Sequence, residues 1–188
     1  MVIENCKICP QFSNCKYDAC NIRPNMGYVL VEQSENGEGL RGVTTDGYRL
    51  HIVDPFCGYA AKEGMAPGFY KILKTGTKRS KSVWAARLDD SETGTINFPN
   101  YRKVMPEGEA VNKTTFEGFI FGLSSVSELS ISKALFKFIR ETPETFRLKY
   151  LTDLGIDNTW DVEWYGDKKP MKFTSTNYTA VIMPMREG

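Results

Sequence analysis

The chain has 188 residues, and its 24 lysine and arginine residues against 23 aspartate and glutamate residues give a formal net charge of +1 at pH 7. This balance excludes a polybasic tail protein and an acidic mimic of nucleic acid, so any contact with nucleic acid must come from local clusters of charge. A hydrophobic content of 41% and a charged content of 25% describe a globular chain. No apolar run approaches the roughly 20 residues that span a bilayer, and residues 1–6 do not resemble a secretion signal, so we expect a cytoplasmic protein in a reducing compartment.

Four of the five cysteines lie in one short window with the spacing C-x2-C-x5-C-x4-C, namely Cys6, Cys9, Cys15 and Cys20. A Cys-x2-Cys pair can place two thiolates on one metal ion, and two further thiolates complete the tetrahedron that zinc accepts. Pro10 directly after the second cysteine also occurs beside iron-sulfur ligands, so an iron-sulfur cluster is an alternative, and unligated thiols or disulfides are another. The sequence predicts a metal-binding segment over residues 1–22, with a structural role because four thiolates leave no open coordination position.

Alternating apolar and polar residues between turn signals predict antiparallel strands in the first half of the chain. Asp46-Gly47 is a strong signal for a tight turn between two of them. A polar connector at Glu107–Glu109 marks the predicted boundary between one subdomain, residues 23–108, and a second, residues 109–188. The strands expected in the first subdomain are Tyr28–Glu32, Leu40–Thr45, Arg49–Val53, Phe69–Leu73 and Val83–Leu88.

The second half combines one expected helix with further strands. Ser130–Glu141 has a helical period of apolar residues, and Pro143 ends it. This order predicts an α+β fold in which a helix packs on one face of an antiparallel sheet. The expected strands are Thr115–Phe121, Phe146–Leu151, Trp160–Tyr165, Met171–Thr174 and Tyr178–Met183.

Three separated stretches carry a resemblance to a known family. Residues 44–50 read TTDGYRL, residues 98–106 read FPNYRKVMP, and residues 181–186 read VIMPMR. They are similar to (A/T)TDG(H/Y)RL, FPDYRR(V/L)(L/I)P and VVMPMR of the bacterial sliding clamp, the beta subunit of DNA polymerase III, and they occur in the same order. The chain resembles this family over residues 21–186, although a full clamp subunit carries three domains and has no counterpart of the cysteine segment.

The resemblance implies a fold of DNA-clamp-like antiparallel sheets with few helices and a pocket for short linear peptides of DNA polymerase, the clamp loader or repair proteins. In that pocket Arg49, Lys103 and Arg186 would form a cationic rim, and adaptable methionines would be part of an apolar floor. From the residues alone, ordinary sheet core and an ordinary hairpin turn are the alternative. The residues that match the pocket are Thr45, Gly47, Tyr48, Arg49, Leu50, Pro99, Lys103, Val104, Val181, Ile182, Met183, Pro184, Met185 and Arg186.

Two groups of basic residues are candidates for contact with DNA phosphates. Lys133, Lys137 and Arg140 form a stripe along the expected helix, and a basic loop precedes the strand at Val83. A solvated polar face is the commoner explanation of such a stripe, and a flexible basic loop is the alternative for the second group. The candidates in the loop are Lys78, Arg79 and Lys81.

An enzyme is not expected, because the chain has one histidine, His51, and no phosphate-binding loop, nucleophile elbow or paired-carboxylate motif. The resemblance implies a sliding-clamp-like processivity factor of DNA replication that binds partner peptides, and the short chain suggests an origin in a phage or mobile element. A chain this short would encircle double-stranded DNA only as a homo-oligomer. The alternative is a clamp-fold module that forms no ring and competes for clamp-binding partners.

Overall fold

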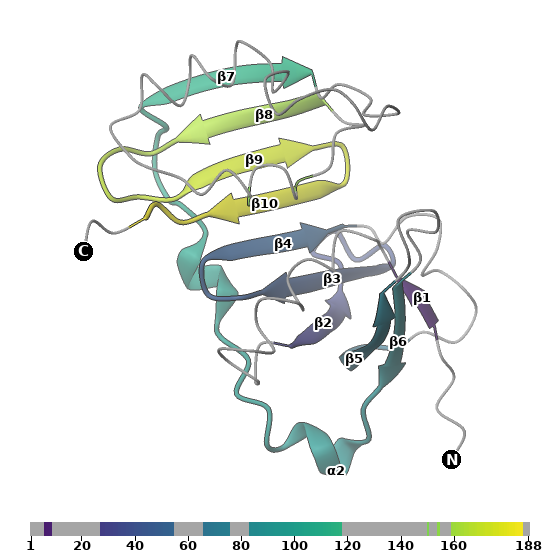
Figure 1. Ribbon diagram of the computed structural model, residues 1–188. Coiled ribbons are helices and arrows are strands. Elements are labelled where there is room, and N and C mark those ends of the chain that lie inside the picture. The colour runs from purple at the N-terminus through teal and green to yellow at the C-terminus, as the bar shows by residue number, and fades with distance from the viewer. Residues whose placement is uncertain are drawn as a thin grey trace, which may run out of the picture. The chain divides into compact units, whose positions relative to one another are not determined.

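The computed structural model describes residues 6–8, 27–54, 66–75, 83–117, 150, 154 and 159–185, and the chain divides into two compact units (Figure 1). Unit 1 is Met1–Asn100 and unit 2 is Tyr101–Gly188. The division lies before the Glu107–Glu109 connector rather than within it. One cause is a hydrogen bond between the segment before the first strand of unit 2 and that unit: the Val111 amide donates to the Trp164 carbonyl at 2.8 Å.

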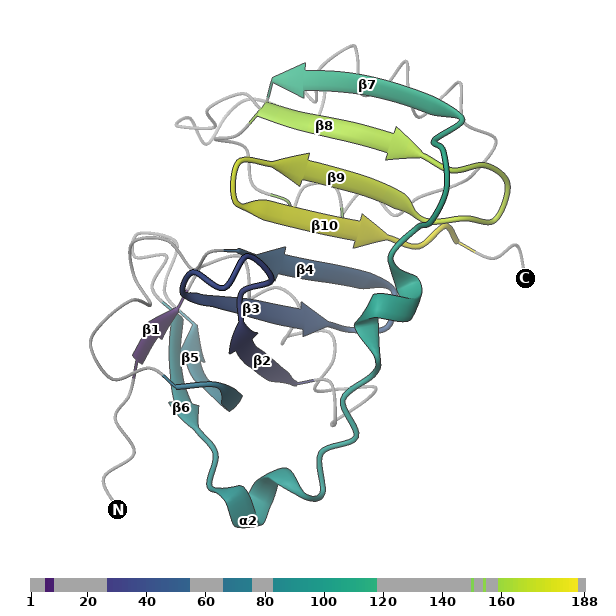
Figure 2. The same ribbon diagram turned by 180° about the vertical axis from the view of Figure 1, so that it is seen from behind.

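The described strands of unit 1 form an antiparallel sheet in the order β1-β6-β5-β2-β3-β4 (Figures 1 and 2). The sequence prediction is confirmed for β2 to β6, and for β3 and β4 it gave the observed bounds. The short strand β1 lies inside the cysteine segment, where no strand was expected. The bounds are β1 Cys6–Ile8, β2 Tyr28–Gln33, β3 Leu40–Thr45, β4 Arg49–Val53, β5 Gly68–Thr75 and β6 Val83–Arg87.

The connection between β2 and β3 is a compact loop over residues 34–39. Gly37 and Gly39 have φ values of 79° and 80°, a conformation that favours glycine because it has no Cβ. The Ser34 amide donates to the Gly39 carbonyl at 3.1 Å, which closes the loop. These residues therefore reverse the chain locally and align β2 with β3.

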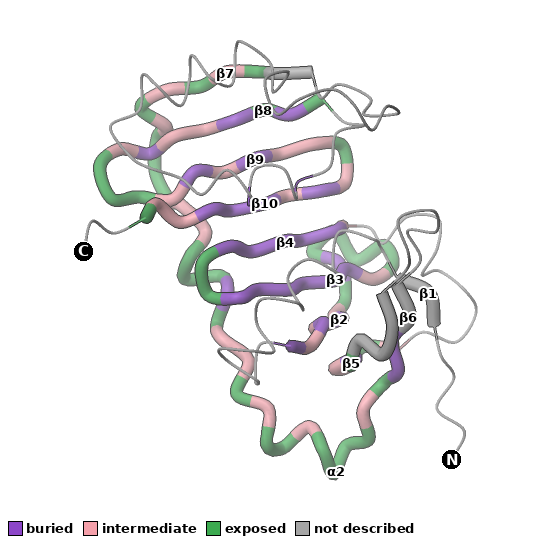
Figure 3. The backbone as a smooth tube through the Cα atoms, viewed as in Figure 1, coloured by how far each residue is buried: buried purple, intermediate pink, exposed green. Residues whose placement is uncertain are grey.

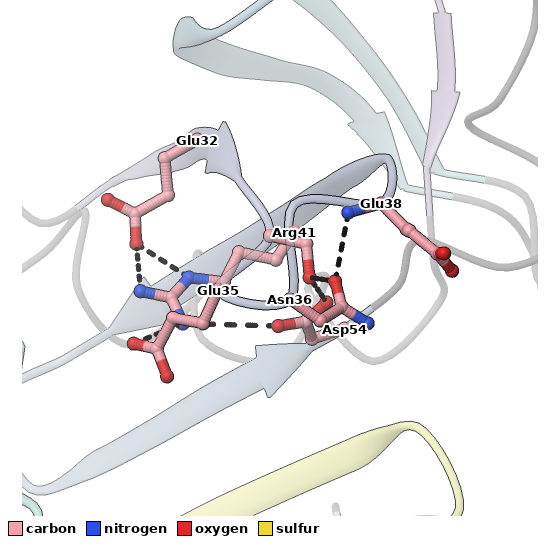
Figure 4. A network of polar contacts seen from close by, with 7 residues as sticks. Glu32, Glu35, Asn36, Glu38, Arg41 and Asp54 are labelled. Atoms are coloured by element: carbon pink, nitrogen blue, oxygen red, sulfur yellow. Dashed lines mark hydrogen bonds and ion pairs between the residues drawn. The ribbon is translucent and has the colours of Figure 1, made fainter.

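A polar network around Arg41 supports the same hairpin (Figure 4). The Arg41 side chain is only 4% exposed, and its guanidinium forms ion pairs with Glu32 at 2.5 Å and Glu35 at 2.6 Å. Ser34 donates to Asp54 at the end of β4, so the network links the loop to a second hairpin. A buried guanidinium needs such partners because an unpaired charge in the interior is strongly destabilising.

The core of unit 1 lies along β2, β3 and β4. Val29 and Val31 of β2 are buried while their neighbours are only half-buried, as the period of a strand requires. All five residues of β4 are buried (Figure 3). The fully buried residues of this strand include His51, whose pKa is lowered to about 3 by desolvation and then by the charge of Arg49.

The described strands of unit 2 form a meander in the order β10-β9-β8-β7. One face buries large apolar side chains, with Trp160 against Tyr178 in an edge-to-face contact at 5.0 Å between ring centroids. β8 to β10 confirm the predicted strands, and β7 lies earlier than the predicted Thr115–Phe121. The bounds are β7 Asn112–Glu117, β8 Thr159–Trp164, β9 Met171–Ser175 and β10 Tyr178–Ile182.

The other face of this sheet carries a cross-strand charge ladder. The carboxylate of Glu163 on β8 forms ion pairs with Lys113 on β7 at 2.9 Å and with Lys172 on β9 at 3.3 Å. The Tyr165 hydroxyl donates to the same carboxylate at 2.8 Å. Hydrogen bonds, first of all that from Lys113, lower the pKa of Glu163 to about 2, so this row is charged across the physiological range.

The helical content that the structure describes is small. The elements are α2, Asp90–Thr93, and the 3-10 helix η2, Tyr101–Val104. Tyr150 is helical, so the strand predicted over Phe146–Leu151 is wrong at that residue, and the predicted helix Ser130–Glu141 lies outside the described residues. Within the described residues no helix has the length and apolar character needed to cross a membrane.

The burial of His51 predicts a pH-dependent stability. The unfolded chain binds a proton below its pKa of about 6.5, whereas the folded protein does not until about pH 3, so stability is lost as the pH falls through this window. Between pH 7 and pH 5 the free energy of unfolding should decrease by about 2 kcal/mol. Chemical denaturation at the two pH values measures this difference.

The matched control is His51→Gln, which removes the only histidine of the chain. Carboxylates titrate mostly below this range, so the variant should show little change between pH 7 and pH 5 whatever its absolute stability. An equal pH dependence in both proteins would contradict a neutral, buried His51.

Candidate functional site

The TTDGYRL stretch forms the hairpin turn between β3 and β4. Asp46 Oδ1 accepts hydrogen bonds from the amides of Tyr48 and Arg49, each at 2.9 Å, and the Asp46 amide donates to the Arg49 carbonyl at 3.3 Å. Gly47 has a φ of 87°, which an L side chain rarely adopts. The predicted tight turn is confirmed, and the aspartate organises it by binding the backbone two and three residues ahead.

A buried ion pair closes this turn. Arg49 Nε donates to Asp46 Oδ2 at 2.9 Å, with 0% of the arginine side chain and 1% of the aspartate side chain exposed. Thr45 reinforces the pair, because its hydroxyl donates to the Arg49 carbonyl at 2.7 Å and accepts from the Gly47 amide at 3.1 Å. The aspartate therefore satisfies two backbone donors and one buried cation.

The turn separates buried side chains from one exposed side chain. Arg49 and Leu50 are each 1% exposed, whereas Tyr48 between the turn and β4 is 41% exposed. The prediction that Arg49 forms part of an exposed cationic rim is therefore wrong, because the carboxylate of Asp46 holds its guanidinium in the interior. Tyr48 is the large side chain that this turn offers to a ligand.

The FPNYRKVMP stretch runs from the end of unit 1 into η2 of unit 2. In η2, Tyr101 is buried, and the guanidinium carbon of Arg102 lies 4.8 Å from its ring centroid. Lys103 and Val104 are exposed, Val104 by 40%. The helix thus anchors through Tyr101 and presents a cation and an apolar side chain to solvent. In unit 1, Pro99 is half-buried.

The VIMPMR stretch begins in β10 and continues beyond it. Val181 and Ile182 are buried in the sheet of unit 2, Met183 and Pro184 are half-buried, and Met185 is 43% exposed. Burial falls along the stretch because the strand ends at Ile182 and a proline follows shortly after it. The two residues from β10 act as core, and of the described residues of this stretch Met185 is the most open to a ligand.

Four large hydrophobic side chains are exposed in the part of the chain that the structure describes, namely Tyr48, Val104, Val111 and Met185. Three of them belong to the residues expected to bind peptide, one from each of the three stretches. Leu50, Val181 and Ile182 of the expected apolar floor are instead buried in their own units. The expected set therefore separates into structural residues and residues open to a ligand.

Asp46 is the residue of this region that the sequence prediction missed. It was assigned only to the turn, whereas the structure makes it the partner of Arg49 and of two backbone amides. The signal was present in the sequence, because an aspartate three residues before an arginine across a tight turn can reach its guanidinium. It acts as a positioning residue for Tyr48.

Several predicted residues lie outside the described residues. The strand β1 places the backbone of Cys6, but the other three cysteines of the segment are not described. Within the described ranges, no group of three or more histidine, cysteine, aspartate or glutamate side chains could hold a metal ion. Also outside are Cys9, Cys15, Cys20, Lys78, Arg79, Lys81, Lys133, Lys137, Arg140 and Arg186.

Comparison with solved structures decides the fold. DNA polymerase III subunit beta from Borrelia burgdorferi matches 98% of this chain with a TM-score of 0.50 and 14% identity. The beta sliding clamp of Caulobacter crescentus matches the same share with a TM-score of 0.50 and 13% identity. The chain has the fold of the bacterial beta sliding clamps. It spans 65% of the length of either clamp chain, and no protein-family model and no curated protein sequence matches it.

Because the Asp46–Arg49 pair is buried, we expect the loss of either partner to lower the stability of the protein strongly. Asp46→Ala should lower the free energy of unfolding by about 3 to 5 kcal/mol, because it leaves a buried guanidinium without its carboxylate. Chemical denaturation measures the change. Asp46→Ala combined with Arg49→Met should recover part of the loss, since the buried charge is then absent while the two backbone amides still lack their acceptor.

The matched control is Asp90→Ala, which removes the carboxylate 4.0 Å from Arg87 in a pair whose side chains are 94% and 48% exposed. Its effect should stay below about 1 kcal/mol, as for other exposed pairs. Similar losses in the two single variants would contradict the role assigned to Asp46.

Proposed function

We propose that this protein is a non-enzymatic clamp-fold accessory protein of DNA replication that binds short linear peptides of a DNA polymerase, a clamp loader or a repair protein. One observation supports this most strongly. Each of the three stretches that resemble sliding clamps exposes one large hydrophobic side chain, which is Tyr48, Val104 or Met185. Scattered exposed hydrophobic residues are normal, but their coincidence with three separate motifs favours binding.

The chemistry of these side chains suits a peptide with apolar anchors. An aromatic ring, a branched aliphatic side chain and a thioether can bury Leu or Phe anchors, and the flexible Met185 can adapt to different sequences. The exposed cation of Lys103 would favour an acidic peptide. In the Caulobacter crescentus clamp, polyethylene glycol is bound to a region proposed to tether beta motifs.

Encirclement of DNA is a second part of the proposal. Because the chain spans 65% of the length of the clamp chains that it matches, a ring would require several copies. A net charge of +1 agrees with topological sliding, which needs little affinity for each phosphate. The alternative is a clamp-fold module that binds the same peptides without forming a ring.

Light scattering during size-exclusion chromatography separates these two models. The ring model predicts a closed homo-oligomer whose mass stays constant over a wide range of protein concentration. A strict monomer over that range would contradict the ring and favour the competing module, while leaving peptide binding in place.

Peptide binding is tested by titrating a fluorescently labelled clamp-binding peptide of a bacterial replicative polymerase and measuring its anisotropy. Tyr48→Ala and Met185→Ala should each weaken binding about tenfold, because each removes exposed apolar surface that the peptide would bury. Both residues are exposed in the free protein, so neither substitution threatens the core.

Val111→Ala is the matched control, since Val111 is 67% exposed but belongs to none of the three stretches. This variant should bind within about twofold of the unmodified protein, as expected for a residue outside the interface. Absence of binding to the unmodified protein, or equal losses in all three variants, would refute the proposed site.

A further inference from the structure

The proposed peptide site contains one side chain whose chemistry can change reversibly. Met185 lies in the short segment that follows β10 and is 43% exposed (Figure 1). Its thioether sulfur accepts an oxygen atom from a peroxide under mild conditions, which the phenol of Tyr48 and the isopropyl group of Val104 do not. Of the three exposed hydrophobic residues of the proposed site, Met185 is therefore the one that an oxidant can modify reversibly.

Burial separates Met185 from the other methionines that the structure describes. Met171 on β9 is 0% exposed and belongs to the core of unit 2. Met105 and Met183 are half-buried. Because a peroxide must reach the sulfur atom, its access decides which methionine reacts. The folded protein thus sets an order of oxidation in which Met185 is first and Met171 is last among these four residues.

Oxidation at this position leaves the sheet of unit 2 intact. β10 ends at Ile182, and Pro184 lies between that strand and Met185, so residue 185 contributes to no strand. In the free protein the added oxygen can be hydrated, because the side chain is open to solvent. A peptide that covers Met185 with an apolar anchor would bury this oxygen without a hydrogen-bond donor, which is unfavourable. The chemical change therefore acts on the complex rather than on the fold.

We propose that Met185 is a site of reversible oxidation by a peroxide and that its sulfoxide weakens the binding of partner peptides. This inference rests on the peptide binding proposed above and names a regulation of that site. In the reaction the oxygen–oxygen bond of hydrogen peroxide breaks and a sulfur–oxygen bond forms. The sulfur loses two electrons, and the peroxide is reduced to water. Methionine sulfoxide reductases reverse the change with electrons from thiols.

Peptide mapping by mass spectrometry tests the order of oxidation. The full chain is treated with dilute hydrogen peroxide for increasing times, and a thiol reductant then reduces any disulfides among its five cysteines. Met185 should be oxidised at least about tenfold faster than Met171, because a buried sulfur reacts only when the structure opens. In the denatured chain the two rates should be similar. Equal rates in the folded protein would overturn the proposed site.

Fluorescence anisotropy tests the effect on binding, with a labelled clamp-binding peptide that contains no methionine or cysteine. Oxidised protein should bind at least about tenfold more weakly, because an apolar contact is lost and a polar oxygen is buried. Methionine sulfoxide reductases should restore the affinity. Met185→Leu is the matched control, since it cannot form the sulfoxide. Whatever its own affinity, that affinity should be the same before and after peroxide treatment, although its cysteines and other methionines meet the same oxidant.

The outcomes distinguish this inference from the proposed function. Absence of binding before any oxidation would refute the proposed function and the oxidative regulation with it. Unchanged affinity after complete conversion of Met185 to the sulfoxide would overturn the regulation alone. An equal loss of affinity in peroxide-treated Met185→Leu would place the sensitive group elsewhere in the chain and would also overturn it.

Discussion

The buried pairing of Asp46 with Arg49 is the constraint on which the proposed binding surface depends. Asp46 directly follows β3 and Arg49 begins β4, and Asp46 Oδ2 lies 2.9 Å from Arg49 Nε. The same carboxylate accepts hydrogen bonds from the amides of Tyr48 and Arg49. An arginine in this position would be strongly destabilising without its partner. The pair therefore fixes one turn conformation, and that conformation leaves Tyr48 exposed while Asp46 and Arg49 are buried.

Unit 2 shows the same separation of structural and exposed residues. In η2 the ring of Tyr101 is buried and Val104 is exposed, and after β10 burial decreases from Ile182 to Met185. The charge ladder centred on Glu163 lies on one face of the sheet, whereas Trp160 packs on the other. Each exposed hydrophobic residue of the two stretches in unit 2 thus follows closely in the chain on a residue buried in that unit.

Much of the strand pattern could be predicted from the sequence because its causes are local. Asp46-Gly47 fixes a hairpin, and the alternation on both sides of it gave β3 and β4 with their observed bounds. The strand predicted over Phe146–Leu151 is wrong at Tyr150, which is helical. In the sequence the apolar residues of this run alternate, but their spacing also includes a four-residue step that fits one face of a helix. Periodicity alone does not distinguish the two structures over so short a run.

The candidate site was predicted less well. Whether each of its residues is buried or exposed decides its role, and the sequence alone does not show this. Arginine is mostly exposed in proteins, so Arg49 was expected at a rim, yet a partner three residues away keeps it inside. Leu50, Val181 and Ile182 are apolar in either role, and only the folded units show that they serve as core. The three exposed residues lie where elements begin or end: Tyr48 directly before β4, Val104 at the end of η2 and Met185 beyond the end of β10.

Photo-cross-linking tests the central claim most directly, with a clamp-binding peptide that carries a photoreactive group on its apolar anchor and with adducts located by mass spectrometry. The account predicts adducts on one or more of Tyr48, Val104 and Met185 and none on Val111. Adducts on Val111 or elsewhere away from the three stretches, with none on these three residues, would contradict it.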